Sequence, residues 1–214
     1  CNLATAYMKL GRSNSAVAAY RTAIRLDSTL VRAHHNLAVA YGEVGRHSEA
    51  IALLEDAVRI DPGAGPSYRL MAGLHQEQGA YDRAQASLVR ALAADSTDAE
   101  ARRSLGRLFR LQGHLAASED ELLRALEFDP ASKETRRELG TLYTYAERYD
   151  EAEEMLHRAR EIDPNCPAVY HSLANLYAAQ GRVEQARTLL DRFAEEFHRG
   201  LAHARKDHRR DLLR

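Results

Sequence analysis

Arginine side chains recur in this chain at spacings that place them on one face of a helix. Arg103, Arg107 and Arg110 stand at i, i+4 and i+7, so a helical backbone would align them in a row. Arg69 and Arg137 lie 34 residues before and after Arg103. A guanidinium group presents N–H donors in a fork that matches a carboxylate. The row therefore predicts recognition of a carboxylate or an acidic peptide.

Acidic residues on the same expected surface leave a second interpretation open. They could pair with the arginines and turn the row into a solvated face whose charges are already compensated. These residues are Glu100, Glu134 and Glu138.

Histidines and the usual catalytic residue types form no recognisable constellation. The chain has ten histidines, and His34 is adjacent to His35, but neighbouring helical residues diverge by about 100° and cannot easily reach one ion. No Cys/His or His/carboxylate spacing matches a known ligand set. There is no Gly-rich phosphate loop, no nucleophile elbow and no paired carboxylates in an evident pocket. We therefore expect a protein that is not an enzyme and has no catalytic residues, metal site or cofactor.

Composition excludes several other classes. The 30 basic and 31 acidic residues nearly cancel, which argues against a nucleic-acid partner. No apolar run reaches the roughly 20 residues of a membrane span. Cys1 and Cys166 are too few and too far apart for a disulfide framework or a zinc site, so the redox compartment stays open, with the cytoplasm favoured.

A period of 34 residues runs through the chain, which indicates stacked repeats. Acidic helix ends recur at Asp27, Asp61, Asp95, Asp129 and Asp163. Glycine recurs at Gly11, Gly45, Gly79, Gly113 and Gly181, with Glu147 in the fifth copy. A small residue recurs at Ala16, Ala50, Ala84, Ser118, Ala152 and Ala186. A large ring recurs at Tyr7, Tyr41, His75, Phe109, Tyr143 and Tyr177.

This pattern resembles the tetratricopeptide repeat family, whose unit is a 34-residue helix–turn–helix. The second repeat reads His34, Leu37, Ala38, Tyr41, Gly45, Ala50, Leu54, Ala57, Pro62, and the fifth reads Arg136, Leu139, Gly140, Tyr143, Ala152, Leu156, Ala159, Pro164. The resemblance implies an all-α fold, a right-handed α-solenoid in which the first helix of each repeat lines a concave groove. The ring and small-residue registers are then core positions rather than a stacking platform.

The repeats divide the chain into an array and a tail. The array covers 1–198, with a partial first repeat at 1–30 and further repeats at 31–64, 65–98, 99–132, 133–166 and 167–198. First helices are expected at 1–10, 32–44, 66–78, 100–112, 134–146 and 168–180, and second helices at 14–27, 48–61, 82–94, 116–128, 150–162 and 184–197. N-caps are expected at Asn14, Ser48, Asp82 and Asp150. Residues 199–214 are expected to form a C-terminal capping helix, or alternatively a basic tail that contacts nucleic acid or membrane.

The groove is where the resemblance places partner binding. The candidate partner-binding residues are Arg69, Arg103, Arg107, Arg110, Arg137, His35, Asn36, Tyr145 and Asn175. Some members grip a chaperone's C-terminal carboxylate with Lys and Asn, but here only Asn36 stands where such an Asn is expected.

We therefore expect a monomeric, non-catalytic scaffold that binds a protein or peptide, acidic ones included, with no nucleic acid and no membrane span. The alternative is the repeat arm of a larger enzyme, for example a glycosyltransferase, or of a secretion or assembly component. Cys1 falls inside the first helix of a repeat, so we expect a fragment or a trimmed mature chain.

Overall fold

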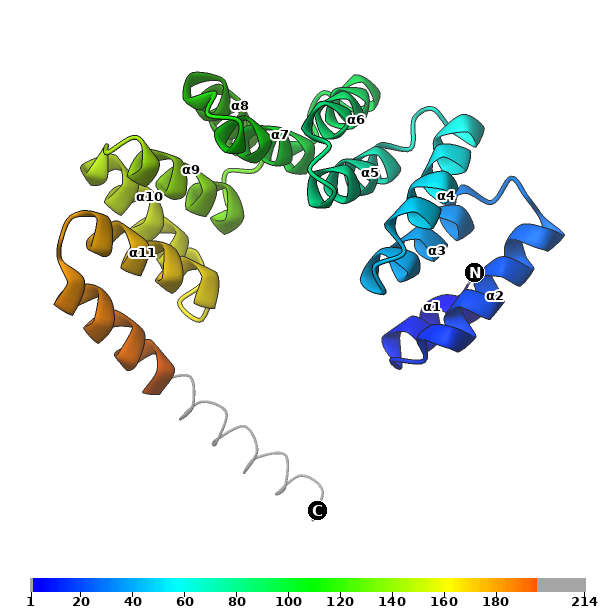
Figure 1. Cartoon of the computed structure of the whole chain (residues 1–214), viewed down its shortest axis with the longest axis horizontal. Coiled ribbons are helices and arrows are strands. Elements are labelled where there is room, and N and C mark those ends of the chain that lie inside the picture. Colours follow the sequence, from blue (N-terminus) through cyan, green and yellow to red (C-terminus); the bar gives the residue numbers. More distant parts are fainter. Residues whose placement is uncertain (1, 196–214) are drawn as a thin grey trace, which may run out of the picture. The chain divides into compact units, whose positions relative to one another are not determined.

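The computed structural model describes residues 2–195, and every regular element in that range is an α-helix. Within each unit described below, helices that follow one another pack as pairs, as α3 with α4 and α9 with α10 (Figure 1). The helices are α1 (Asn2–Lys9), α2 (Ser13–Leu26), α3 (Val31–Glu43), α4 (His47–Ile60), α5 (Gly65–Glu77), α6 (Tyr81–Ala94), α7 (Ala99–Leu111), α8 (Leu115–Phe128), α9 (Lys133–Tyr145), α10 (Tyr149–Ile162), α11 (Pro167–Ala179) and helical residues 183–195.

The chain forms two compact units that divide between Gln112 and Gly113. Helices α1 to α7 belong to the first unit, and α8 to α11 with residues 183–195 belong to the second. The division falls between the two helices of the repeat expected at 99–132. The cap or tail expected at 199–214 lies outside the described residues, as does Cys1.

First helices such as α3 end in a backbone turn that sets the position of the second helix. In the second repeat, the N–H of Arg46 donates to the carbonyl oxygen of Tyr41 at 2.9 Å, and the N–H of Gly45 donates to that of Gly42 at 2.9 Å. Gly45 has φ 75°, which a residue without Cβ adopts at no steric cost. This pair of bonds is the Schellman motif. The motif needs a residue with positive φ at this position, which explains why glycine recurs there.

The predicted helix ranges are correct to within about a residue at most ends, but the predicted N-caps are wrong. Asn14, Ser48, Asp82 and Asp150 are each the second residue of their helix. The second helices start earlier because the Schellman turn positions them through the backbone, and their N-cap residues make no side-chain cap bond.

Side-chain caps occur instead on two first helices. The Asp98 carboxylate accepts the N–H of Ala101 at 3.0 Å at the start of α7. The Ser132 hydroxyl accepts the N–H of Thr135 at 3.2 Å at the start of α9. Each bond satisfies an N–H that has no partner within the helix.

The recurring aspartate after each second helix fixes the turn into the next repeat. Asp95 is an example: its Oδ1 accepts the backbone N–H of Thr97 at 2.9 Å and the Thr97 hydroxyl at 2.6 Å. Such turns compete with helix continuation. The equivalent bonds run from Thr29 to Asp27, Gly63 to Asp61, Ala131 to Asp129 and Asn165 to Asp163.

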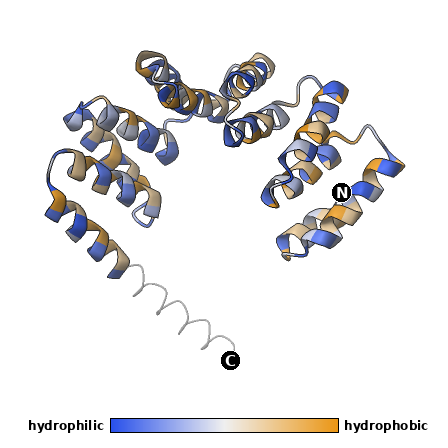
Figure 2. Cartoon of the chain, in the orientation of Figure 1, coloured by the Kyte–Doolittle hydropathy of each residue, from blue (hydrophilic) through white to orange (hydrophobic). Residues whose placement is uncertain are grey.

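Most positions of the predicted core registers are buried, while Tyr7 and Phe109 are partly buried. The small-residue positions Ala16, Ala50 and Ala152 are fully buried, and so are Leu54 and Leu156. Hydrophobic and hydrophilic residues are interspersed along the helices (Figure 2), and most of the buried residues are apolar. Small side chains allow close approach of the paired backbones, which is the packing role expected for this register.

Candidate functional site

Two arginines of the predicted row share one carboxylate in the first unit. An Arg69 Nη2 lies 3.0 Å from Glu100 Oε2, and an Arg103 Nη2 lies 3.7 Å from Glu100 Oε1. Arg69 also forms an ion pair with Asp98, whose other oxygen caps α7. The side chains of Arg69 and Arg103 are about one quarter exposed. Glu100 thus compensates part of this positive surface, as the second interpretation of the sequence anticipates.

Arg107 and His35, two further residues of the predicted binding surface, make polar contacts within the first unit. Arg107 donates through Nη2 to Gln76 Oε1 at 3.1 Å, which joins α7 to α5. His35 Nδ1 lies 3.1 Å from the Ser67 hydroxyl. Burial lowers the pKa of His35 and the nearby Arg69 lowers it further, so the imidazole is neutral at pH 7.

The remaining predicted residues are divided between the two units. Arg110 and Asn36 are half-buried on α7 and α3 of the first unit. In the second unit, Arg137 donates through Nη2 to Glu138 at 2.6 Å. Tyr145 is 66% exposed at the end of α9, and Asn175 is exposed on α11. The first unit therefore brings together Arg69, Arg103 and Arg107, while Arg137 has its own carboxylate.

A stacked arginine covers the ring register in three repeats. The Arg46 guanidinium lies 4.1 Å from the centroid of the Tyr41 ring. The same arrangement joins Arg148 to Tyr143 at 4.3 Å and Arg182 to Tyr177 at 4.4 Å. We call these pairs the tyrosine–arginine stacks. Their sequence signal is the recurring spacing of five residues between Tyr and Arg, which the predicted ring register does not include.

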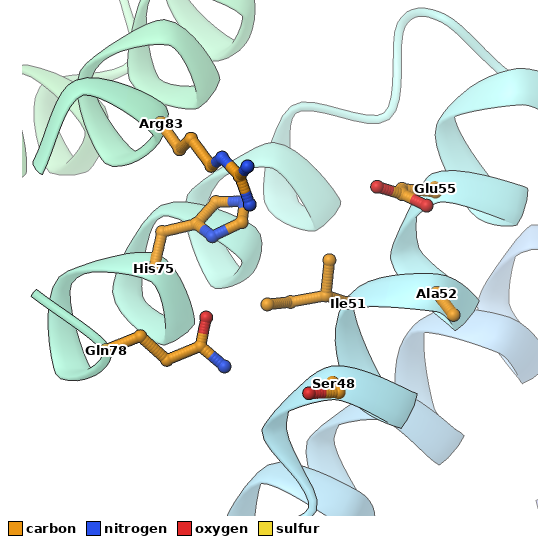
Figure 3. A pocket seen from close by; sticks show the side chains of 7 residues that line it. All are labelled: Ser48, Ile51, Ala52, Glu55, His75, Gln78 and Arg83. Carbon is orange, nitrogen blue, oxygen red and sulfur yellow. The ribbon is translucent and has the colours of Figure 1, made fainter. Parts of the chain in front are cut away.

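One pocket of about 460 Å³ opens in the first unit where the third repeat lacks such a stack (Figure 3). Its walls come from α4 on one side and from α5, α6 and the turn between them on the other. The lining residues are Ser48, Ile51, Ala52, Glu55, His75, Gln78 and Arg83. None of these is among the groove residues predicted as binding sites, although His75 was recognised as a member of the ring register.

His75 is the buried member of this pocket. The residue is 7% exposed, and its Nδ1 is buried without a hydrogen-bond partner. Burial lowers the pKa of His75, and the charge of Arg83 lowers it further, while Glu55 and the amide of Gln78 oppose the shift. The imidazole is therefore neutral at pH 7.

Within the described residues, no three or more His, Cys, Asp or Glu side chains gather where a metal ion could sit. None of the helices in residues 2–195 is both long and apolar enough to cross a membrane.

The chain belongs to the tetratricopeptide repeat family. Models described as tetratricopeptide or TPR repeat match residues 4–45, 31–64, 70–133 and 143–205, which together cover most of the sequence. The expected all-α repeat-solenoid class is confirmed. No curated protein matches the chain.

Solved structures with the same fold are distant in sequence. PilW, described as a widely conserved type IV pilus biogenesis factor, is 19% identical, with 92% of this chain and 91% of PilW covered at a TM-score of 0.81. A tetratricopeptide repeat protein from Parabacteroides merdae is 20% identical, with 91% of this chain and 77% of that protein covered at a TM-score of 0.78. YrrB, described as a TPR protein with an unusual peptide-binding site, is 22% identical, with 88% and 98% covered at 0.59. At these identities the likeness shows the fold alone.

Proposed function

We propose that this protein is a monomeric, non-catalytic interaction scaffold whose first helices bind an acidic peptide or the acidic face of a partner helix. The family and the fold support a repeat scaffold of the protein-interaction type. The proposal that the partner is acidic rests on the arginine surface of the first unit, which consists of Arg69, Arg103, Arg107 and Arg110.

The observation that carries the proposal is the charge balance of the contacts on this surface. Arg69, Arg103 and Arg107 are met by two carboxylates, Asp98 and Glu100, and by the neutral amide of Gln76. Glu100 is 57% exposed at its side chain and serves both Arg69 and Arg103. An incoming carboxylate can displace this exposed partner at little desolvation cost, since surface ion pairs contribute only about 0–1 kcal/mol.

The half-buried state of these arginines strengthens the argument. A guanidinium that is one quarter exposed forms stronger bonds to a ligand carboxylate than a fully solvated one, because water screens it less. Tyr145 and Asn175 on the first helices of the second unit, with Arg137, are proposed as further contacts of the partner. YrrB, a TPR protein described as having an unusual peptide-binding site, supports the class of ligand.

The test is a double substitution on α7. A partner is first recovered by affinity capture and mapped to a synthetic peptide, and its affinity is measured by titration calorimetry. Arg103→Ala with Arg107→Ala should weaken binding by about 2–4 kcal/mol, since each charge-assisted bond contributes about 1.5–3 kcal/mol and the two are not additive.

The matched control replaces two arginines outside this surface. Arg90→Ala with Arg124→Ala removes two exposed guanidinium groups from α6 and α8 and should leave the affinity unchanged. Affinity should also fall with added salt. A peptide that binds the α7 double variant as tightly as the parent would leave the arginine surface as a compensated, solvated face.

A second candidate is that the chain is the repeat arm of a larger enzyme or assembly component. PilW is described as a pilus biogenesis factor, and its fold matches over nearly the whole of both chains. Affinity capture with the full-length gene product distinguishes the two. An arm would co-purify with the same assembly when the arginines of α7 are replaced.

A further inference from the structure

The pocket between α4 and the α5–α6 hairpin carries opposite charges on its two walls. Glu55 projects from α4, and Arg83 projects from α6 on the other side (Figure 3). Ile51 points into the space between them, and Ser48 and Gln78 lie at one end. The volume of about 460 Å³ is within the range of sites that hold small molecules.

The third repeat differs from the second at two positions on the α5–α6 side of the pocket. His75 occupies the place of Tyr41, 34 residues earlier, and Ala80 occupies the place of Arg46. In the second repeat, these positions hold a phenol ring and a guanidinium stacked on it. The third repeat has a smaller ring and no guanidinium here, so these two positions fill less volume.

The third departure is a reversal of charge. Arg83 stands where Glu49 holds the guanidinium of Arg46 in the second repeat. Within residues 2–195, neither Arg83 nor Glu55 has an ion-pair partner in the protein. The buried His75 Nδ1 on the same wall as Arg83 also lacks a hydrogen-bond partner. The pocket thus presents a cation, an anion and a buried polar nitrogen whose bonds are not supplied by the protein.

We propose that this pocket binds a small zwitterion of the α-amino-acid type, with its carboxylate on Arg83 and His75, its ammonium on Glu55 and an apolar side chain against Ile51. A guanidinium is the preferred partner of a carboxylate, and the carboxylate of Glu55 is a matching acceptor for an ammonium group. A ligand with only one charge would leave the opposite wall unmatched. The site lies on α4, α5 and α6 and shares no residue with the arginine surface, so it stands independently of the function proposed above.

Binding is followed by the NMR signals of the His75 ring. The protein is labelled for NMR, the His75 ring signals are assigned by their loss in His75→Tyr, and each common amino acid is titrated to about 10 mM, because ligands this small often bind with millimolar dissociation constants. A zwitterion with its carboxylate on the imidazole should shift the His75 signals saturably. It should also raise the pKa of His75, because a carboxylate favours the protonated ring.

The ligand class is tested with half-molecules. For any amino acid that binds, the analogue without its amino group and the analogue without its carboxylate should each bind roughly tenfold or more weakly, since each loses one charge-assisted contact. Equal binding of the deaminated analogue would show a plain anion site. That result would overturn the zwitterion assignment.

The two walls are tested with variants that remove one charge each. Arg83→Gln and Glu55→Gln should each weaken binding by roughly tenfold or more. Both residues are exposed, so the core stays intact. Arg90→Gln on α6 and Asp56→Asn on α4 change the same charges on the same helices without touching the pocket, and they should leave binding unchanged.

A filled pocket gives the last test. His75→Tyr with Ala80→Arg places a larger ring and a guanidinium in the pocket and should abolish binding of the amino acid, while circular dichroism checks that the variant remains helical. No saturable response to any common amino acid in the parent protein, or unchanged binding in the filled variant, would overturn the proposal.

Discussion

Arg148 lies over the ring of Tyr143 and at the same time joins two glutamates from different helices. Its Cζ is 4.3 Å from the ring centroid, its Nη1 donates to Glu119 at 2.8 Å, and its Nε donates to Glu151 at 2.7 Å. The hydroxyl of Tyr143 donates to the second oxygen of Glu119 at 2.9 Å. These four side chains connect α8, α9 and α10, so a single guanidinium stabilises the junction of two repeats.

Arg148→Ala should therefore destabilise the protein. The stack contributes about 0.5–1 kcal/mol at a partly exposed site, and loss of the shared ion pairs adds to it, so we expect a decrease of about 1–2 kcal/mol in the free energy of unfolding. Urea denaturation followed by circular dichroism measures it. Arg158→Ala is the control, because Arg158 is exposed and forms an ion pair with Glu154 four residues earlier on the same helix. Equal effects of the two variants would contradict a special role for Arg148.

The protein should become less stable at alkaline pH because the Tyr143 hydroxyl ionises. Burial raises the pKa of Tyr143 to about 12, and its hydrogen bond to Glu119 contributes to the shift. Because the folded pKa lies above the unfolded value near 10, the contribution is fully present below pH 10 and is lost as the pH rises towards 12. Unfolding curves of the parent and of Tyr143→Phe between these pH values test this. The variant should lose less stability over the window, and parallel curves would contradict the prediction.

Replacing Glu147 by glycine should increase the stability of the protein. It has φ 58°, the left-handed conformation that Gly11, Gly45, Gly79, Gly113 and Gly181 adopt in the other repeats. A residue with a Cβ pays about 1 kcal/mol for this conformation. Glu147→Gly should raise the free energy of unfolding by up to about 1 kcal/mol, because relief of strain exceeds the added freedom of the unfolded chain. Glu147→Ala keeps the Cβ and should give no such gain. A destabilised glycine variant would show that Glu147 makes a compensating interaction.

The 34-residue period made most of the fold predictable, and local geometry explains where the prediction failed. Repeated core residues such as Ala50 and Leu54 carry their role in sequence spacing alone. The predicted N-caps failed because the Schellman turn at Gly45 uses backbone bonds, which no side-chain pattern shows. The tyrosine–arginine stacks were missed because each joins a helical tyrosine to an arginine five residues later in the turn, a spacing that helical periodicity does not bring together.

The candidate sites differ in the same way. The arginine surface was visible because helical spacing aligns Arg103 with Arg107, yet the partners of these residues depend on packing that spacing does not give. Predicting the pocket at His75 would have required two substitutions in the repeat, at His75 and Ala80, to be considered together as a loss of side-chain volume. A sequence pattern shows each departure but not the space between them.

Replacing Gly140 and Gly73 by alanine should change the stability of the protein in opposite directions. A Cβ on Gly140 would lie 2.5 Å from Leu156 Cγ and 3.3 Å from the carbonyl oxygen of Ala152, so the paired helices α9 and α10 would have to move apart. Gly140→Ala should therefore destabilise the protein by about 1–3 kcal/mol. Gly73 lies in helix α5, and a methyl group added there would have no neighbouring atom within 4 Å. Gly73→Ala should stabilise the protein by about 0.5–1 kcal/mol, since glycine is a poor helix former. Thermal and urea unfolding of both variants, each beside the parent, measures the difference. If both substitutions stabilised the protein, the close approach of α9 and α10 at Gly140 would be wrong.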